Sequence, residues 1–382
     1  MTYLDYNAST PVDPRVLEAM VDALTRLPGN PSSIQHRPGQ EAAEAIEQAR
    51  ERVGELMDAS PSEVVFTSGA SEALTLATLG VVLGSPSRPN ILVAATEHKA
   101  TIAAAELASR LSGGEVGVVP VTSSGVVDLD ALGDLLGPDV GLVSVMHANN
   151  ETGVVNPVSE VARLAHEHGA LFLCDVTQSV SKVPVSMAGL GADIAAFSSH
   201  KLYGPKGAGA LVASRHVQKA LVPIFPGGGQ ERGLRGGTQD TASIVGFGVA
   251  CALASAEQEG DSAHMSSLMG TFLASLDATA ADAVVVGAAH GRIPNTVNLR
   301  FVGADAEAVM ASMPNIAVST GSACEAASPT VSHVLLAMGL SRAEASECIR
   351  VSLGRPTTVD DVLQAAVAMG RAVQRVRAMT AA

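Results

Sequence analysis

The chain has 382 residues, of which 47% are hydrophobic and 16% are charged, and its formal net charge is −14 at pH 7. This length exceeds one ordinary domain, and the apolar content suffices for a sizeable core. The acidic charge excludes a broadly basic nucleic-acid-binding surface, because neutralising phosphates requires clustered Lys and Arg. Neither an apolar stretch of membrane-spanning length nor a basic-then-apolar leader pattern occurs, so we expect a cytoplasmic protein without a membrane partner.

The first two-thirds of the chain alternates helical and strand patterns. Helices are expected at 13–25, 39–58, 70–83, 101–111 and 158–168. Short β-branched runs predict seven strands, at 64–67, 91–94, 117–119, 142–146, 171–174, 194–197 and 210–213. Repeated βα units predict an α/β domain in which a mostly parallel, seven-stranded sheet is covered by helices on both faces.

The pattern changes after the Gly-Gly-Thr run at 236–238. Helices are expected at 242–257, 262–279, 306–312, 331–338 and 359–377, with short strands near 283–286 and 296–299. This predicts a smaller α+β C-terminal domain. We therefore expect residues 14–250 to form the large domain, and residues 1–13 together with 251–382 to form the small one.

The stretch from 197 to 207 reads FSSHKLYGPKG, an apolar strand followed by a glycine-rich turn. Open α/β sheets bind their ligands at such strand ends. The chain holds only five lysines against nineteen arginines, and two of the five, Lys201 and Lys206, fall here. Lysine, unlike arginine, can lose its proton when desolvated and then form a Schiff base. On this stretch alone, a solvated turn lysine is an equally open interpretation.

Two further strand ends carry polar groups. Asp175 ends an apolar strand and Gln178 follows three residues later; the carboxylate could cap a helix, ligate a metal or keep a pyridine nitrogen protonated. Between a strand and a helix, the backbone around Ser71 could bind a phosphate, with a plain helix N-cap as the alternative. Neither a Walker loop nor a dinucleotide fingerprint occurs. Together, a phosphate site, a carboxylate and an amine-trapping lysine indicate pyridoxal phosphate.

The four cysteines are widely separated. They form neither a CxxC pair nor a zinc-binding spacing, so no metal site is predicted. Cys174 and Cys348 lie in apolar, strand-like contexts and Cys251 lies in an Ala-rich helix, as is typical of core thiols. Cys324 lies instead in a run of small and polar residues, where a thiol could be reached.

With these residues the sequence resembles the cysteine desulfurases, which belong to the class V aminotransferase group of fold-type I pyridoxal-phosphate enzymes. The resemblance covers essentially the whole chain. Its motifs, in order, are YLDYNA (3–8), GNPSS (29–33), TSGASE (67–72), EHKA (97–100), HANNETG (147–153), DVTQS (175–179), SHK (199–201), GGGQER (227–232), STGSAC (319–324) and RVSLGR (350–355).

The resemblance implies roles for individual residues. Lys201 would carry pyridoxal 5′-phosphate as a Schiff base, His98 would stack on the ring and move protons, and Cys324 would be the nucleophile. The other implied contacts are Asp175 with the ring nitrogen; Asn150 and Gln178 with the ring oxygen or substrate; Ala70, Ser71, Ser198 and His200 with the phosphate; and Thr238 with the phosphate from the other subunit of a homodimer. Arg350, which opens a strand pattern, would clamp the substrate carboxylate; a surface salt bridge is the alternative.

The reaction implied by the resemblance removes sulfur from L-cysteine, leaving L-alanine and a persulfide on Cys324 for a sulfur-acceptor protein. Enzymes of this family supply iron–sulfur cluster assembly, tRNA thiolation and DNA phosphorothioation, and no direct contact with nucleic acid is expected here. A selenocysteine lyase, or another class V aminotransferase-like enzyme, is the alternative. Glu325 stands where the family commonly has Thr or Ser, and its carboxylate would disfavour the Cys324 thiolate.

Overall fold

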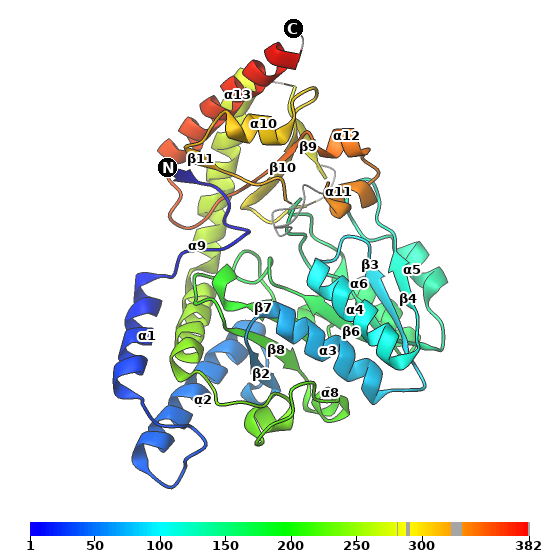
Figure 1. The fold of residues 1–382 in the computed structure, drawn as a ribbon, viewed down its shortest axis with the longest axis vertical. Helices are drawn as coiled ribbons and strands as arrows, with labels where there is room; N and C mark the ends of the chain where they lie inside the picture. The colour runs from blue at the N-terminus through cyan, green and yellow to red at the C-terminus, as the bar shows by residue number, and fades with distance from the viewer. Residues whose placement is uncertain (281, 288–290, 322–330, 381–382) are drawn as a thin grey trace.

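The computed structural model describes residues 1–280, 282–287, 291–321 and 331–380 (Figure 1). The strands are β1 (Thr2–Tyr3), β2 (Val64–Thr67), β3 (Asn90–Ala94), β4 (Val116–Val119), β5 (Val140–Ser144), β6 (Leu171–Asp175), β7 (Ile194–Ser198), β8 (Gly209–Ala213), β9 (Val284–Val286), β10 (Thr296–Arg300), β11 (Ile316–Ala317) and β12 (Cys348–Ser352). The α-helices are α1 (Pro14–Arg26), α2 (Arg37–Met57), α3 (Ala70–Gly84), α4 (Lys99–Ser112), α5 (Leu129–Leu135), α6 (Val158–Glu167), α7 (Met187–Leu190), α8 (Arg215–Ala220), α9 (Thr241–Ala280), α10 (Ala306–Ala311), α11 (His333–Ala337), α12 (Arg342–Ala345) and α13 (Val359–Thr380). The described residues also form the short 3-10 helices η1 (Pro61–Glu63), η2 (Ser199–Lys201) and η3 (Gln230–Gly233).

The larger sheet has seven strands in the order β2-β8-β7-β6-β5-β3-β4. Its neighbours from β7 to β4 pair in parallel, whereas β8 is antiparallel to both β2 and β7. Six strands therefore point the same way, and their carboxyl ends share one edge. The predicted seven-stranded, mostly parallel sheet is confirmed.

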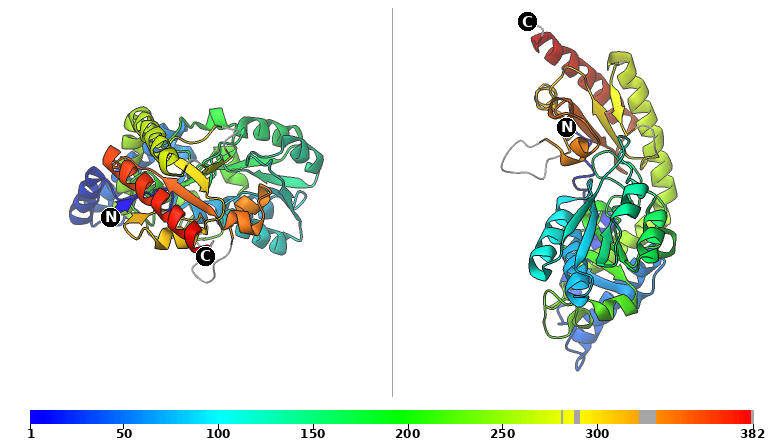
Figure 2. Two further views of the ribbon diagram at one scale, coloured as in Figure 1. Left: turned by 90° about the horizontal axis from the view of Figure 1, so that it is seen from above. Right: turned by 90° about the vertical axis from the view of Figure 1, so that its right-hand side faces the viewer.

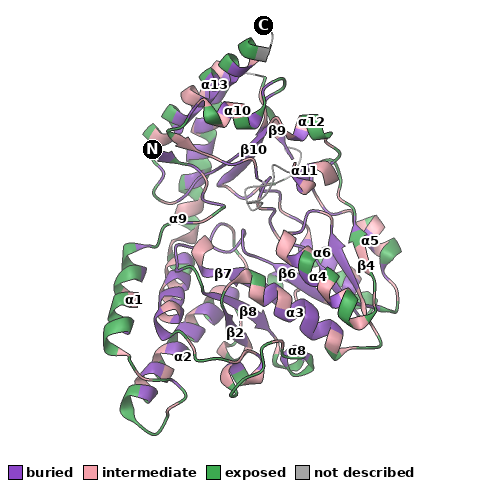
Figure 3. Cartoon of the chain, viewed as in Figure 1, coloured by how far each residue is buried: buried purple, intermediate pink, exposed green. Residues whose placement is uncertain are grey.

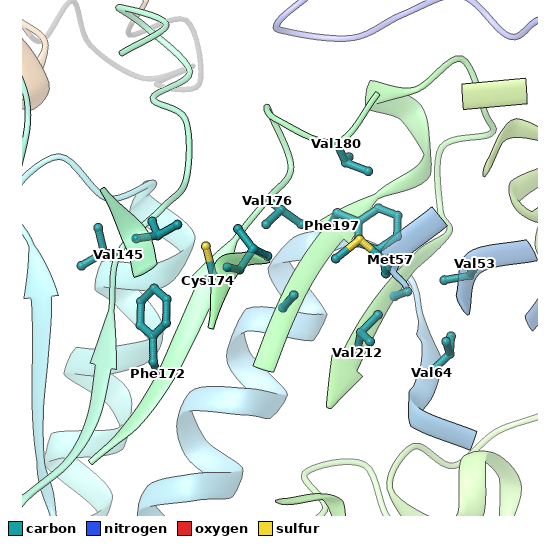
Figure 4. Packing of buried hydrophobic residues seen from close by; sticks show 14 of the residues in the cluster. Val53, Met57, Val64, Val145, Phe172, Cys174, Val176, Val180, Phe197 and Val212 are labelled. Atoms are coloured by element: carbon teal, nitrogen blue, oxygen red, sulfur yellow. The ribbon is translucent and has the colours of Figure 1, made fainter. Parts of the chain in front are cut away.

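Alternate residues of these strands pack on opposite faces of the sheet, as the period of two requires. Phe172 and Cys174 of β6 face a cluster that includes residues of α2 and α9, whereas Leu173 faces a cluster with residues of α3 and α4. Figure 4 shows part of the first cluster around Phe172 and Phe197. Strands β2, β5, β7 and β8 are buried at every residue, as the purple arrows of Figure 3 show, whereas the edge strand β4 is partly exposed. The result is a three-layer α/β/α unit.

Helix α9 corrects one expectation. The sequence predicts two helices interrupted near residue 260, but α9 is continuous over 40 residues. Gly260 costs a helix interior only about 1 kcal/mol, and packing offsets this cost because α9 lies against α1 and α2 in one half and α13 in the other. Figure 1 and Figure 2 show α9 running from the large sheet to the smaller, C-terminal unit.

The smaller unit contains a three-stranded antiparallel sheet, β12-β10-β9, and the parallel pair β1-β11. Its core packs the C-terminal half of α9 and the length of α13 against the sheet. Arg350 lies at the centre of β12 and does not open a strand, because pairing with β10 extends β12 back to Cys348. Among the described helices, none combines the length and the apolar character needed to cross a bilayer.

Candidate active site

A cavity of about 470 Å³ lies where β2, β3, β5, β6 and β7 end. Ten of the twelve residues that the sequence singles out line it: Ala70, Ser71, His98, Asn150, Asp175, Gln178, Ser198, His200, Lys201 and Arg350. Thr238 does not line the cavity and is exposed on the chain. Cys324 lies outside the described residues, as does Glu325. The strand ends thus bring together nearly all of the predicted site.

Lys201 reaches the cavity from η2, directly after β7. Its Nζ donates hydrogen bonds to the backbone oxygens of Asn7 and Ala8, the latter at 2.8 Å. Asn7 itself is buried and is held by hydrogen bonds from its side chain to the Asn150 carbonyl and the Thr296 hydroxyl. The N-terminal segment therefore forms one wall of the site. The sequence motif at 3–8 marks this segment, but its role required the tertiary structure.

The N-terminus of α3 forms an anion cradle. No side chain caps α3 at Gly69, so the positive end of the helix faces the cavity. Gly69 has a φ of +154°, which L side chains rarely adopt, and a Cβ on Gly209 would lie 2.6 Å from the Gly69 Cα. The Ser198 hydroxyl accepts a hydrogen bond from the Ala70 N–H at 3.1 Å. Gly69, Ala70, Ser71 and Ser198 line the cavity here, so a phosphate at this place would meet the first turn of α3.

The basic residues near the cradle are not all charged at neutral pH. Burial, together with the charges of Lys201, Lys206 and Lys182, lowers the pKa of His200 to about 4. His200 is therefore a neutral hydrogen-bonding group, and its Nδ1 lies 3.2 Å from the Ser9 hydroxyl. Lys206, which lines the cavity and is exposed, supplies charge there; the glycine-rich turn at 204–207 was the sequence signal for it.

His98 and Asp175 are two polar residues that line the cavity. His98 is the N-cap of α4, and its Nδ1 accepts the Ala100 N–H at 3.1 Å, so the neutral ring carries its proton on Nε2. Burial lowers the pKa of His98, although the Asp175 charge acts in the opposite direction. Asp175 is 6% exposed and accepts the Thr177 N–H at 2.8 Å. The site thus pairs a fixed neutral imidazole with a buried carboxyl group.

Arg350 is a buried cation that reaches the cavity from the smaller sheet. It is 3% exposed, so a surface salt bridge is excluded. Its Nη2 pairs with Asp5 at 2.6 Å and its Nη1 donates to the Asn150 carbonyl at 3.0 Å. Its Nε has no hydrogen-bond partner among the described residues. A guanidinium with spare donors at the rim of a cavity suits a carboxylate ligand.

Glu151 contacts the described residues on both sides of the stretch 322–330. Its Oε2 accepts the Ser332 hydroxyl at 2.5 Å, and a Cβ on Gly321 would lie 2.6 Å from the same oxygen. Gly321 lines the cavity and has a φ of +88°. Burial raises the pKa of Glu151, with Ser332 and Arg350 acting in the opposite direction. The motif at 147–153 included Glu151, but nothing in the sequence connected it with residues 321 and 332.

The three cysteines that the structure describes are all buried. Burial raises the pKa of the Cys174 and Cys251 thiols well above the ordinary value, and raises that of Cys348 to about 12. The predicted core position of these three thiols is therefore confirmed. A buried thiol with a raised pKa is a poor nucleophile, because the thiolate is the reactive form.

Comparisons with known proteins agree with this architecture. Residues 2–364 match the family model described as aminotransferase class-V. A cysteine desulfurase from Frankia sp. (strain EuIK1) is 46% identical over 391 residues, an alignment that covers 100% of this chain and 93% of that protein. The solved structure of a NifS-like protein aligns with a TM-score of 0.88 and 34% identity, covering 100% of this chain and 99% of that one. The structure of SspA in complex with cysteine aligns with a TM-score of 0.82 and 34% identity, covering 94% of this chain and 100% of that one.

Proposed function

Because this chain belongs to the class V aminotransferase family, as one of its cysteine desulfurases, we propose that its cavity binds pyridoxal 5′-phosphate covalently at Lys201. Cys324 would receive sulfur from L-cysteine. One observation carries the cofactor assignment. The amine of Lys201, the carboxyl of Asp175 and the uncapped N-terminus of α3 all face one cavity at adjoining strand ends. An amine, a carboxylate and an anion cradle match an aldehyde, a pyridine nitrogen and a phosphate, so the residues fit the group.

Each residue then has a chemical task. Bound pyridoxal phosphate supplies an electron sink next to the substrate α-carbon. Asp175 would hold the ring nitrogen in its protonated form, and the released Lys201 amine would take the proton from the substrate α-carbon. His98, with its proton on Nε2, would lie over the ring and exchange protons there. The remaining proposed contacts are Asn150 and Gln178 with the ring oxygen or substrate, and Ala70, Ser71, Ser198 and His200 with the phosphate.

The substrate is held and cleaved by two further groups. Arg350 would bind the carboxylate of L-cysteine with the donors that the protein leaves unused. The Cys324 thiolate would form a bond to the substrate sulfur as the Cβ–S bond breaks. The electron pair of that bond would stay with carbon, which takes up a proton and leaves as L-alanine. The other three thiols are buried with raised pKa values, which supports Cys324 as the acceptor.

The partners belong to the same proposal. Thr238 is exposed and lies outside the cavity, as expected if it completes the phosphate site of a second copy in a homodimer. A sulfur-acceptor protein would take the persulfide sulfur and return Cys324 to its thiol form. The division into residues 14–250 and 1–13 with 251–382, and a cytoplasmic location, remain predictions from the sequence.

The decisive experiment combines two variants with one product assay. Purified protein with pyridoxal phosphate and L-cysteine should release L-alanine and carry an extra sulfur on Cys324, detected by mass spectrometry. Cys324→Ser should keep the visible absorption of the bound cofactor and lose persulfide, whereas Lys201→Ala should lose both. Normal turnover of L-cysteine by Cys324→Ser would show that another group accepts the sulfur.

A further inference from the structure

Lys182 is a buried amine that the reaction outlined above does not use. It is only 5% exposed, and no carboxylate lies within ion-pair distance of it in the described part of the chain. Its Nζ donates instead to two oxygens of one residue, the backbone oxygen of Gln178 at 3.0 Å and the side-chain Oε1 at 3.3 Å. Lys182 thus keeps hydrogen-bond donors inside the fold that an apolar side chain of similar length would not supply.

The backbone after β6 aims Lys182 at Gln178. Two short turns follow Asp175, with the Val180 N–H donating to the Val176 carbonyl and the Lys182 N–H to the Ser179 carbonyl, both at 2.9 Å. Ser181 then adopts a left-handed conformation, with a φ of +71°. The chain thereby turns back, so that the Lys182 side chain returns to the residue four positions before it.

The position is also fixed from outside this turn. The Ser262 hydroxyl of α9 donates to the Lys182 carbonyl. A small internal cavity separates Lys182 from Lys201, and Tyr6, Tyr203 and Asp261 also line it. Asp261 pairs with Arg355 at 2.8 Å, and Arg355 also pairs with Asp13 and Glu257. Within the described residues, the Lys182 amine bonds to Gln178 and forms no ion pair with Asp261.

Lys182 determines which way the Gln178 carboxamide points. The Lys182 Nζ donates to the amide oxygen of Gln178, and an amine keeps N–H donors in both its protonated and its neutral form, so the carbonyl oxygen of the amide faces it. The amide nitrogen must then face the other way, where it donates to the Asn7 carbonyl at 3.0 Å. Lys201 donates to that same carbonyl oxygen. Gln178 and Lys201 consequently present N–H groups to one region of the cavity.

We propose that Lys182 is a positioning residue, which acts through Gln178 by locking the carboxamide with its N–H donors toward the cofactor. The ring oxygen of pyridoxal phosphate is an acceptor and needs a donor at this place. If the amide were rotated, its carbonyl oxygen would meet the ring oxygen and repel it. This inference rests on the proposed function, because it assigns Lys182 to the same cofactor.

A double-mutant cycle on cofactor affinity tests the inference, with the apparent Kd for pyridoxal phosphate measured by titrating the apoprotein. Lys182→Met removes the donors and keeps the apolar stem; we expect the affinity to fall about five- to tenfold, the effect of one net hydrogen bond. Gln178→Leu should have a loss of similar size. The combined variant should bind no more weakly than Gln178→Leu alone, because Lys182 acts only through Gln178.

Two further variants separate positioning from fold and charge. Lys182→Gln offers an N–H donor to Gln178, and should recover part of the affinity even if Lys182→Met folds poorly. Lys219→Met removes the same charge from an exposed position on α8 and should leave the Kd unchanged. Wild-type affinity in a folded Lys182→Met protein, or losses that multiply in the combined variant, would overturn the inference. If wild-type protein binds no pyridoxal phosphate at all, the proposed function itself fails, and this inference fails with it.

Discussion

Two regions of the molecule bury basic side chains in opposite ways. Beside β2, the edge strand of the large sheet, Arg50 is 2% exposed. Every nitrogen of its guanidinium has an acceptor: Glu231, Glu47 and the Val64 carbonyl. Behind the cavity-lining Gln178, Lys182 has only the neutral oxygens of that residue, and Arg350, which lines the cavity, has an Nε without a partner among the described residues. The first arrangement is saturated. The second keeps donors available.

In one region a buried basic side chain is fully paired within the fold, whereas in the other region hydrogen-bond donors remain that no carboxylate in the described part of the chain accepts. Glu231 accepts from both Arg50 Nη atoms, at 2.7 and 2.9 Å, and also from the Phe66 N–H at 3.0 Å. It does so from a left-handed backbone conformation, with a φ of 45°, that a non-glycine residue seldom adopts. This pair ties η3 to α2 and β2. Arg350 instead keeps an N–H that no described residue accepts, which suits a ligand group, whereas the donors of Lys182 go to Gln178.

Breaking the saturated pair should have the largest effect on stability. Glu231→Ala would leave the Arg50 charge buried without its carboxylate, and we expect the free energy of unfolding to fall by about 3–5 kcal/mol. Urea unfolding followed by circular dichroism measures this change. Glu47→Gln removes the other carboxylate of Arg50, which is 62% exposed, and should change stability by less than about 0.5 kcal/mol. Equal effects of the two substitutions would show that the buried Arg50–Glu231 pair stabilises the fold no more than the exposed Arg50–Glu47 pair does.

Lys182 should make stability depend on pH. Burial, followed by the Lys201 charge, lowers its pKa from 10.5 to about 7. Between these values the unfolded chain binds the proton and the folded chain does not, so the free energy of unfolding should rise with pH across this window. Below pH 7 both the folded and the unfolded chain bind the proton, and the destabilisation caused by burying the charged Lys182 is complete. Lys182→Met lacks this contribution. The free energy of unfolding of Lys182→Met minus that of wild type should therefore be greater near pH 7 than near pH 10 by about 2–4 kcal/mol.

This comparison of Lys182→Met with wild type subtracts all other titrating groups, provided that both unfold reversibly. Lys219→Met removes an exposed lysine and should give a difference from wild type that does not change with pH. A Lys182→Met difference that is likewise constant between pH 7 and pH 10 would mean that Lys182 stays protonated in the folded protein.

Replacing Arg350 tests whether its guanidinium binds the substrate carboxylate. Arg350→Lys keeps a charge opposite Asp5 and loses the planar donor set, so the KM for L-cysteine should rise about 10- to 100-fold while the cofactor Kd stays the same. Steady-state alanine production and an apoprotein titration measure the two quantities. Arg300→Lys alters a paired arginine of β10, bound to Glu344 and Glu347, and should leave KM unchanged. An unaltered KM in Arg350→Lys would remove Arg350 from the substrate site.

The sequence predicts the sheet and most of the cavity for one physical reason. Polar residues such as Asp175 and Lys201 directly follow apolar runs, and parallel strands bring their carboxyl ends to one edge. The sequence does not predict partners that are distant along the chain. Arg50 and Glu231 are separated by 181 residues, and neither carries a local mark of its partner. The continuity of α9 likewise depends on packing against α2 and α13, which outweighs the local signal of Gly260.

The orientation of Lys182 lies beyond sequence reasoning for a different reason. Its apolar neighbours Val180 and Val183 indicate burial, but whether the amine turns toward Gln178 depends on one backbone angle at Ser181. Left-handed geometry at a serine has no reliable sequence signature, since glycine is the residue that normally marks it. The residues that line the site could therefore be predicted, whereas those that orient them could not.

The smallest expected effect on stability is at Ser181, whose left-handed backbone directs the Lys182 side chain toward Gln178. Its φ of +71° costs an L residue about 1 kcal/mol relative to glycine, so Ser181→Gly should raise the free energy of unfolding by about 0.5–1 kcal/mol if the backbone stays in place. Ser181→Ala keeps the Cβ and should give no such gain, which separates backbone relief from loss of the hydroxyl. The cofactor Kd should be unchanged in both, because Lys182 still reaches Gln178. A stabilised Ser181→Gly protein with weakened cofactor binding would show instead that the constrained backbone at Ser181 is itself needed to hold the Gln178 amide.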